Sequence, residues 1–156
     1  MPILLAIKRL ELEIRKRNNM ILAIIGSRTF QDEELLRQSL ASFDDITEIV
    51  SGGAKGADAW AEIYAKENQI PLTVFKPNWK KYGQGAGVVR NTDIINYADE
   101  VVAFWDGESK GTKDSIDKAH SLNKKVHIIY YEVKYESQNI IIRLHSYNIQ
   151  KPINQG

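Results

Sequence analysis

Short apolar runs and helical patterns alternate along the chain from about residue 20 to residue 130. The first run is continuously apolar and ends in Gly26, which is typical of a strand buried on both faces of a parallel sheet. The predicted strands are residues 21–25, 47–50, 71–75, 101–104 and 125–130. Helical patterns occupy the intervals, around residues 32–43, 57–68, 86–97 and 112–123. Because parallel strands are joined by right-handed crossovers, this order predicts an α/β fold: a Rossmann-like doubly wound, mainly parallel five-stranded sheet with helices on both faces.

The composition fits one globular domain and narrows the chemistry. The 156 residues are 43% hydrophobic and 26% charged, and the net charge is only +1, so nothing global demands a nucleic-acid or membrane partner. There is no cysteine, which excludes disulfides, thiolate catalysis and zinc–thiolate sites and agrees with a cytoplasmic location. The three histidines are too scattered to predict a metal site. We therefore expect neither a metal nor a cofactor.

The two ends of the chain fall outside the alternating pattern. Residues 1–19 hold five basic and two acidic residues, and their apolar positions are close to helical spacing, which predicts an amphipathic helix. We expect an N-terminal appendage here: an accessory helix, an oligomer contact or a translated leader. It is neither a signal peptide nor long enough to span a bilayer. The nucleotide-binding domain is then residues 20–131, and residues 132–156 form a polar extension in which 140–142 is a further edge strand, followed by a frayed tail.

Four glycine-rich or polar turns follow predicted strands. In an open parallel sheet, ligands bind at the carboxyl ends of the strands near the point where strand order reverses. The first turn, Gly26-Ser27-Arg28, combines a sharp backbone turn, a hydroxyl and a guanidinium fork suited to phosphate. The second, residues 51–58, has three glycines immediately before a helix, where backbone N–H groups bind phosphate. Its candidate binding residues are Ser51, Gly52, Gly53, Lys55 and Asp58, the last as a helix cap or a ribose contact.

The third and fourth turns add aromatic and hydroxyl groups. Residues 78–91 contain Trp79 and Tyr82, which can stack on a base, and basic residues that can face phosphates. In the helix predicted at the end of this segment, Arg90 and Asn91 are further candidate binding residues. The fourth turn again brings glycine and hydroxyls to a helix N-terminus, with Ser109, Gly111 and Thr112 as candidates. A helix cap or surface loop explains any one turn, but four turns converging on one sheet edge favour a binding site.

Taken together, these motifs resemble one family. They run from Gly26-Ser27-Arg28 through Ser51-Gly52-Gly53-Ala54-Lys55-Gly56-Ala57-Asp58 and the Trp79–Asn91 segment to Phe104-Trp105-Asp106-Gly107 and Gly111-Thr112. The combination, over about residues 20–130, is similar to the YspA/cpYpsA-related branch of the SLOG superfamily. That superfamily includes the DNA-processing protein A family and the lonely-guy phosphoribohydrolases.

The resemblance implies a role for each turn. Residues 26–28 would line the pocket, and residues 51–53 would cradle phosphate. Gly111 and Thr112 would hold a second phosphate or a ribose, while Arg90 would approach the ligand from its helix.

One position departs from the hydrolase pattern. The phosphoribohydrolases carry Pro-Gly-Gly-x-Gly-Thr-x-x-Glu, and alignment on Gly111-Thr112 puts Ser115 at the glutamate position. Serine cannot replace that carboxylate in ribosyl chemistry. Asp114 lies one residue earlier and points about 100° around the helix. Arg90 and Asp114 are thus the candidate catalytic residues, and the incomplete pair favours binding over turnover.

Three functions follow from these observations. The favoured hypothesis is binding or sensing of a nucleotide-derived ligand, such as ADP-ribose or a nucleoside phosphate. The alternatives are a nucleotide N-glycosidic hydrolase, and single-stranded DNA binding as in DNA-processing protein A, with Lys80 and Lys81 in a basic rim. We expect a nucleotide-type small molecule as partner, no membrane association, and a homodimer formed through the apolar face of residues 3–14.

Overall fold

The computed structural model describes residues 2–17, 19–136, 139–143 and 148–150. Its centre is a parallel sheet of five strands: β1 (Met20–Gly26), β2 (Ile46–Ser51), β3 (Leu72–Val74), β4 (Glu100–Trp105) and β5 (Lys125–Tyr130). The strand order is β3-β2-β1-β4-β5-β8, in which the short strand β8 (Asn148–Gln150) pairs antiparallel with β5. The predicted Rossmann-like, mainly parallel sheet is confirmed, and β8 adds an antiparallel edge that the sequence pattern did not indicate.

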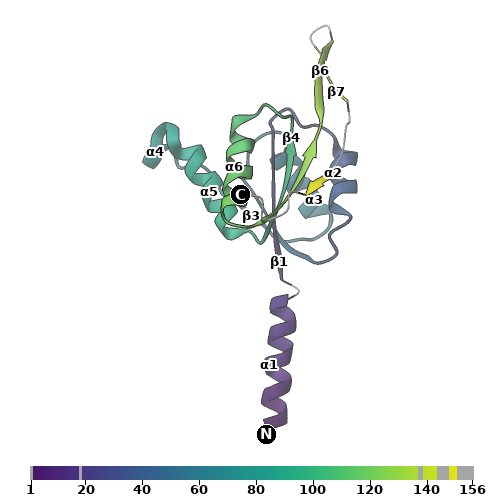
Figure 1. Cartoon of the computed structure of the whole chain (residues 1–156), viewed down its shortest axis with the longest axis vertical. Coiled ribbons are helices and arrows are strands. Elements are labelled where there is room, and N and C mark those ends of the chain that lie inside the picture. Colours follow the sequence, from purple (N-terminus) through teal and green to yellow (C-terminus); the bar gives the residue numbers. More distant parts are fainter. Residues whose placement is uncertain (1, 18, 137–138, 144–147, 151–156) are drawn as a thin grey trace.

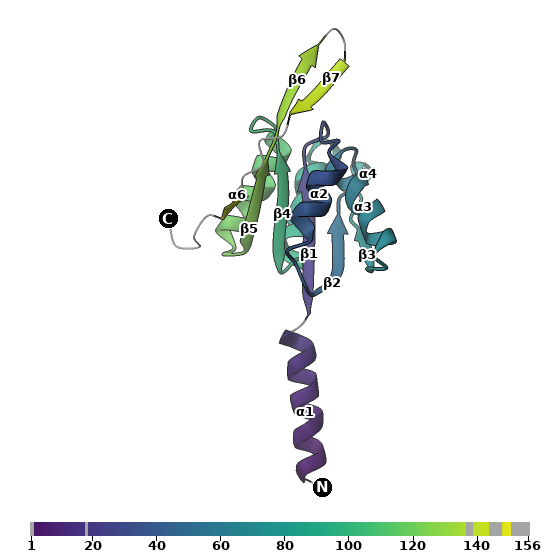
Figure 2. The same ribbon diagram turned by 90° about the vertical axis from the view of Figure 1, so that its right-hand side faces the viewer.

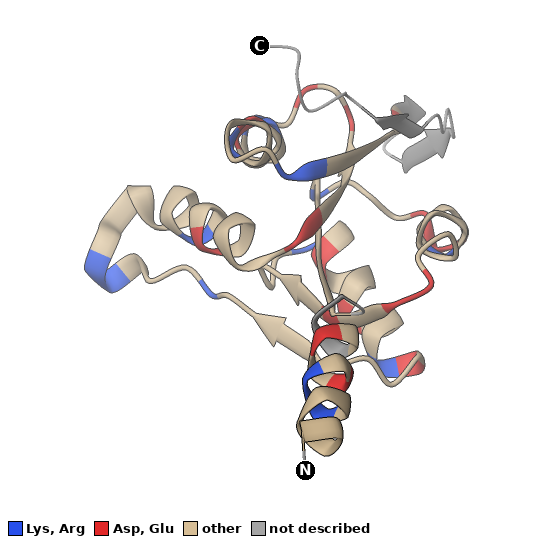
Figure 3. Ribbon diagram, turned by 60° about the horizontal axis from the view of Figure 1, so that its bottom comes forward, with Lys and Arg blue, Asp and Glu red and all other residues tan. Residues whose placement is uncertain are grey.

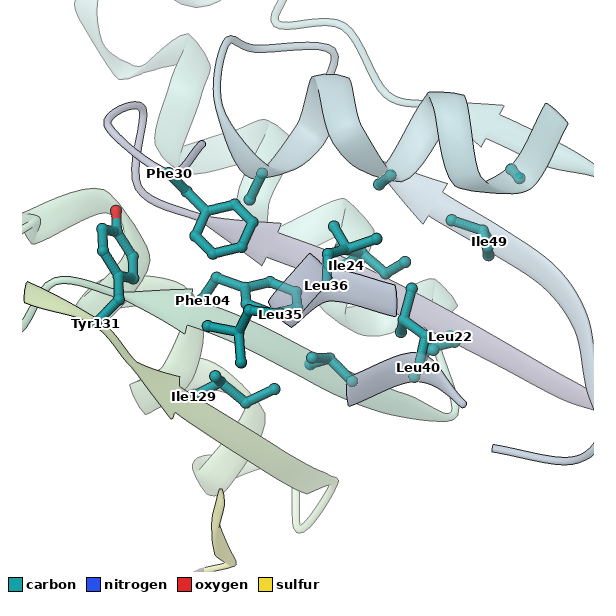
Figure 4. Packing of buried hydrophobic residues seen from close by; sticks show 14 residues of the cluster. Leu22, Ile24, Phe30, Leu35, Leu36, Leu40, Ile49, Phe104, Ile129 and Tyr131 are labelled. Atoms are coloured by element: carbon teal, nitrogen blue, oxygen red, sulfur yellow. The ribbon is translucent and has the colours of Figure 1, made fainter. Parts of the chain in front are cut away.

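The helices lie on both faces of the sheet. They are α2 (Glu33–Leu40), α3 (Ala57–Glu67), α4 (Trp79–Tyr82), the 3₁₀ turn η1 (Gly83–Gly85), α5 (Ala86–Tyr97) and α6 (Lys110–Ser121). Side chains alternate along β1, so Leu22 and Ile24 pack with α2 and α3, while Ala23 and Ile25 pack with α5 and α6. Figure 4 shows the first of these layers, with Phe30 and Phe104 stacked at its end near the turns.

Two elements extend away from this domain in opposite directions (Figures 1 and 2). Helix α1 (Pro2–Arg17), where the sequence predicts an amphipathic helix, continues downward from β1. A hairpin of β6 (Glu132–Glu136) and β7 (Asn139–Arg143) rises beyond β5. The edge strand expected at residues 140–142 thus lies in this separate hairpin, and β8 occupies the sheet edge. The tail from residue 151 onward lies outside the described residues.

The strand order fixes where a ligand site can form. The chain runs outward from β1 through β2 to β3, and then returns to β4 on the other side of β1. The connections that follow β1 and β4 therefore run toward opposite edges of the sheet, and a crevice opens between them at the carboxyl ends of these strands. No helix in the described part of the chain has the length and apolar character needed to cross a lipid bilayer.

Candidate functional site

A cavity of about 400 Å³ lies at this reversal of strand order. Its walls come from the turn after β1, the turn between β2 and α3, one side of α5, and the turn between β4 and α6. The lining residues are Ile25, Gly26, Ser27, Arg28, Thr29, Gly52, Ala54, Asp58, Arg90, Asn91, Ile94, Asp106, Ser109, Gly111, Thr112 and Ser115. Segments separated by up to about ninety residues thus meet in one crevice that contains two arginines.

Two glycines allow the walls to approach each other backbone to backbone. A Cβ on Gly26 would lie 2.6 Å from both the Ala57 Cβ and the Phe104 carbonyl oxygen. A Cβ on Gly56 would lie 2.4 Å from the Ser27 carbonyl oxygen, and Gly56 also has a φ of +79°. Only glycine, which has no Cβ, permits these close approaches and the positive φ at position 56. These contacts fix the turn after β1 against the start of α3, and with it the position of Arg28 at the cavity mouth.

The turn between β2 and α3 is closed by a side chain from its own helix. Asp58 is buried, and its Oδ2 accepts a hydrogen bond from the Ala54 N–H at 3.1 Å. Burial raises the Asp58 pKa to about 6, and this rise is opposed by the Ala54 N–H, the nearby Arg90 guanidinium and the Gly52 backbone. The carboxylate therefore already occupies the Ala54 N–H and interacts with the backbone of Gly52, which the resemblance assigns to a phosphate cradle.

Arg90 connects α5 to the same turn. Its Nη1 donates to the Gly52 carbonyl oxygen at 2.5 Å, and its Nε donates to Asn91 Oδ1 at 2.9 Å. Burial lowers the Arg90 pKa; the Asp58 charge opposes this change and the Arg28 charge adds to it. A guanidinium has five N–H donors in a rigid fork, more than these two bonds use. Arg90 is thus held in a fixed orientation at the cavity with capacity for a ligand oxygen.

The turn between β4 and α6 is organised differently. Asp106 Oδ1 accepts hydrogen bonds from the backbone N–H groups of Glu108 at 2.9 Å and Ser109 at 2.8 Å, which shapes the turn before the helix begins. The side chain of the N-cap residue Ser109 makes no capping hydrogen bond to α6, and its Oγ lies 3.2 Å from Thr112 Oγ1. The first N–H groups of an α-helix have no partner within the helix, and the helix dipole attracts anions to them. This end of α6 opens into the cavity through Gly111 and Thr112.

Most of the predicted ligand-binding residues come together in this cavity. Those that line it are Gly26, Ser27, Arg28, Gly52, Asp58, Arg90, Asn91, Ser109, Gly111 and Thr112. The structure places the other candidates outside its lining; these are Ser51, Gly53, Lys55, Trp79, Tyr82 and Asp114. Ser51 is fully buried below the turn, whereas Gly53 and Lys55 are on its outer side and exposed.

The aromatic candidates lie on an arm that leaves the domain. Figure 1 shows α4 at the outer end of a segment that extends from α5, away from the sheet. Trp79 and Tyr82 are 58% and 43% exposed, and Lys81 Nζ lies 5.1 Å from the centroid of the Tyr82 ring. Figure 3 shows that basic residues mark the tip of this arm. Neither ring lines the cavity, and their stacking on a base stays a prediction.

Of the two candidate catalytic residues, only Arg90 lines the cavity. Asp114 is paired with Lys118, whose Nζ lies 2.8 Å from Asp114 Oδ2. Ser115, at the position of the hydrolase glutamate, does line the cavity and donates from its Oγ to the Gly111 carbonyl oxygen at 3.3 Å. The helix therefore presents a hydroxyl to the cavity at the place where the hydrolases carry a carboxylate.

Several lining residues were not among the predicted binding residues. Thr29 and Asp106 are polar residues within or next to the motifs, so the sequence could have identified them as binding residues. Ala54, Ile25 and Ile94 offered none, because small and apolar residues in these elements are equally expected in the core. The described residues contain no group of three or more acidic or histidine side chains arranged to hold a metal ion.

Comparison with known proteins supports the family predicted from the motifs. Residues 20–82 match the family model YAcAr, described as the YspA, cpYpsA-related SLOG family. The matched segment contains the first two turns of the cavity, and Arg90 and the β4–α6 turn lie beyond it. The curated proteins contain no match to this chain. The match over residues 20–82 confirms the resemblance, seen in the motifs, to the YspA, cpYpsA-related SLOG family.

Proposed function

We propose that the cavity binds a nucleotide or nucleotide-derived ligand, of the ADP-ribose or nucleoside-phosphate class, and that the N-terminus of α6 holds its phosphate. The match to the SLOG family model supports a nucleotide-related function of this coarse kind. The observation that carries the proposal is the joining, in one crevice, of two arginines with an open helix N-terminus. These are the groups that bind phosphate in other Rossmann-like folds.

The contrast between the two glycine-rich turns supports the choice of α6 as the phosphate site. In the β2–α3 turn, the Asp58 carboxylate accepts from Ala54 and so stands where a phosphate oxygen would have to bind. A second anion there would meet an unfavourable negative charge above a pH of about 6. At α6, Gly111 and Thr112 of the first turn line the cavity; the Asp106 carboxylate also lines it, but it accepts from Glu108 and Ser109, ahead of the first helical residues. Arg28 and Arg90, from the opposite walls, would then complete the charge balance.

Isothermal titration calorimetry tests this proposal with AMP, ADP, NAD, ADP-ribose and cyclic nucleotides as separate ligands. We expect one of them to bind, and we expect Arg28→Ala to weaken that binding by roughly tenfold or more, since a charge-assisted hydrogen bond contributes about 1.5–3 kcal/mol. Lys113→Ala is the matched control, because Lys113 pairs with Asp117 outside the cavity. Absence of heat with every ligand, or equal loss in both variants, would refute the proposal.

Hydrolysis of the ligand is a second candidate, favoured by the Asp58 pKa of about 6. A carboxyl group with a pKa near the working pH can exchange protons with a substrate or with water. Asp58 faces the same cavity as Arg90, which would steady a phosphate. Chromatography of nucleoside monophosphates incubated with the protein tests this activity. Release of free base that is lost in Asp58→Asn would establish it, whereas an unchanged nucleotide peak would leave binding alone.

A further inference from the structure

We propose that α1 pairs with α1 of a second copy of the chain, side by side and in opposite directions. This inference is independent of the ligand site, because α1 and the cavity lie at opposite ends of the strands. Figures 1 and 2 both show the helix continuing from the amino end of β1, whereas the cavity lies above the carboxyl ends.

Helix α1 exposes an unusual amount of apolar surface. Its isoleucine and leucine side chains are between 45% and 75% exposed, from Ile14 at the low end to Ile3 at the high end. An isolated helix of this length is only marginally stable in water, and a contiguous apolar surface on a protein generally marks an interaction site. The sheet and its helices do not cover this helix in either view (Figures 1 and 2).

The spacing of these side chains indicates that the partner of α1 is another copy of the same helix. Ile3, Ile7, Leu10 and Ile14 follow one another at intervals of four, three and four residues. That is the spacing of the a and d positions of a coiled coil, which lie on one side of the helix and interlock with the same positions of a partner helix. The stripe is also self-complementary when one helix is reversed, because Ile3 then faces Ile14 of the second copy and Ile7 faces its Leu10. A two-fold axis between positions 8 and 9 generates this closed dimer.

The distribution of charge selects the reversed orientation. The last turn of α1 contains the consecutive basic residues Arg15, Lys16 and Arg17. Parallel helices would bring the two basic ends together, whereas antiparallel helices place them at opposite ends and align the helix dipoles favourably. The globular domain is attached at this same end (Figure 1). Opposed helices of about 24 Å, at 1.5 Å per residue, therefore also keep the two domains apart.

Engineered cysteines test the pairing directly, because the chain has no cysteine of its own. Separately tagged Ile3→Cys and Ile14→Cys proteins are mixed and oxidised. Antiparallel pairing predicts that the 3–14 cross-link between differently tagged chains dominates. Cross-links within each variant alone would indicate parallel helices, and no cross-link would indicate no pairing, so either result overturns the proposal. Leu5→Cys mixed with Leu12→Cys is the matched control, since these exposed positions have the same relation to the two-fold axis but lie off the stripe.

Analytical ultracentrifugation gives an independent test with the full chain. We expect the unmodified protein to dimerise with rising concentration, Leu10→Glu to remain monomeric, and Leu12→Glu to dimerise like the unmodified protein. Both leucines are similarly exposed, at 55% and 56%, so neither substitution disturbs the domain core. Circular dichroism checks that both variants stay folded. A monomeric unmodified protein at every concentration, or equal effects of the two substitutions, would contradict the proposal whatever the outcome of ligand titrations.

Discussion

The β2–α3 turn and the β4–α6 turn occupy equivalent places in the fold but are completed in different ways. Both follow a parallel strand, contain glycine at positive φ and lead into a helix without a side-chain cap. In the β2–α3 turn, Asp58 folds back and accepts from Ala54. In the β4–α6 turn, Asp106 shapes the residues before the helix and leaves the helix N-terminus facing the cavity.

This difference separates crowded glycines from glycines with open space, which the proposed function assigns to the ligand. Gly56 is crowded by the backbone of the turn after β1, whereas a Cβ on Gly107 or Gly111 would meet no atom within 4 Å. A glycine-rich turn therefore has two uses in this protein. One turn lets two segments of the chain approach each other, and the other leaves room in front of a helix for a molecule that is not part of the chain.

The largest predicted effect contrasts two of the positive-φ glycines, Gly56 and Gly107. Gly56→Ala would place a Cβ against the Ser27 carbonyl oxygen, and we expect a loss of about 3 kcal/mol in the free energy of unfolding. Gly107→Ala keeps a similar φ, +82° against +79°, but has open space, so we expect only about 1 kcal/mol. Urea denaturation measures both. Equal losses would show that the two turns are not packed differently.

The second prediction concerns the charge that closes the β2–α3 turn. The folded-state pKa of Asp58 is about 6, above its ordinary value of 3.8, so the folded protein binds the proton more tightly than the unfolded chain. The Asp58 charge therefore reduces stability above a pH of about 6, and this cost disappears as the pH falls from about 6 to about 4. Asp58→Asn should stabilise the protein by about 2 kcal/mol at pH 7.5, and by much less at pH 4. A stability difference that does not change with pH would contradict the assigned pKa.

Ligand affinity should respond to the open turn and not to the closed one. Thr112→Val removes one buried hydroxyl at nearly constant volume, and we expect roughly tenfold weaker binding, or about 1.4 kcal/mol. Lys55→Ala, on the exposed side of the β2–α3 turn, should change the dissociation constant by less than about twofold. Calorimetric titration with the ligand found for the unmodified protein compares the two. A larger effect of Lys55→Ala would reverse the roles of the turns.

The smallest expected effect separates stability from binding at one residue. Gly111 lies in the first turn of α6 with open space around its Cα, so Gly111→Ala should stabilise the protein slightly, by about 0.5 kcal/mol. The added methyl group would nevertheless project into the cavity and weaken ligand binding. Thermal unfolding with and without ligand measures both quantities. A variant that loses stability, or that binds the ligand as well as the unmodified protein, would argue against a phosphate at this helix end.

The main sheet was predictable from the sequence because apolar residues concentrate in its strands, most clearly in β1 and β4, and helical patterns separate them. Helix α5 and strand β5 have the predicted bounds, and the other strands of the main parallel sheet differ from the prediction by one residue at each end. Helix α4 and strand β8 were not predicted, because these four and three residues are too few for a helical period and contain no apolar run. The β6–β7 hairpin depends on the pairing of two strands, and a single sequence does not specify that pairing.

The candidate site was predictable in part. Parallel strands bring their following turns to one edge, so Arg28, Gly52 and Thr112 could be placed together from their positions alone. The sequence left Asp58 either as a cap or as a ribose contact, since only packing determines that its carboxylate reaches Ala54. The sequence also did not indicate the direction of the α4 arm, which extends away from the sheet (Figure 1). Trp79, on this arm, is therefore not part of the cavity lining.

The most direct test of the proposed phosphate position is a titration followed by backbone-amide NMR, with AMP and inorganic phosphate as separate probes. If the phosphate binds at the start of α6, the amide signals of Gly111 and Thr112 should shift most, and those of Gly53 and Lys55 should move little. If the largest shifts fall on Gly53 and Lys55, the β2–α3 turn is the phosphate site, Asp58 does not exclude an anion from it, and the contrast between the two turns is wrong.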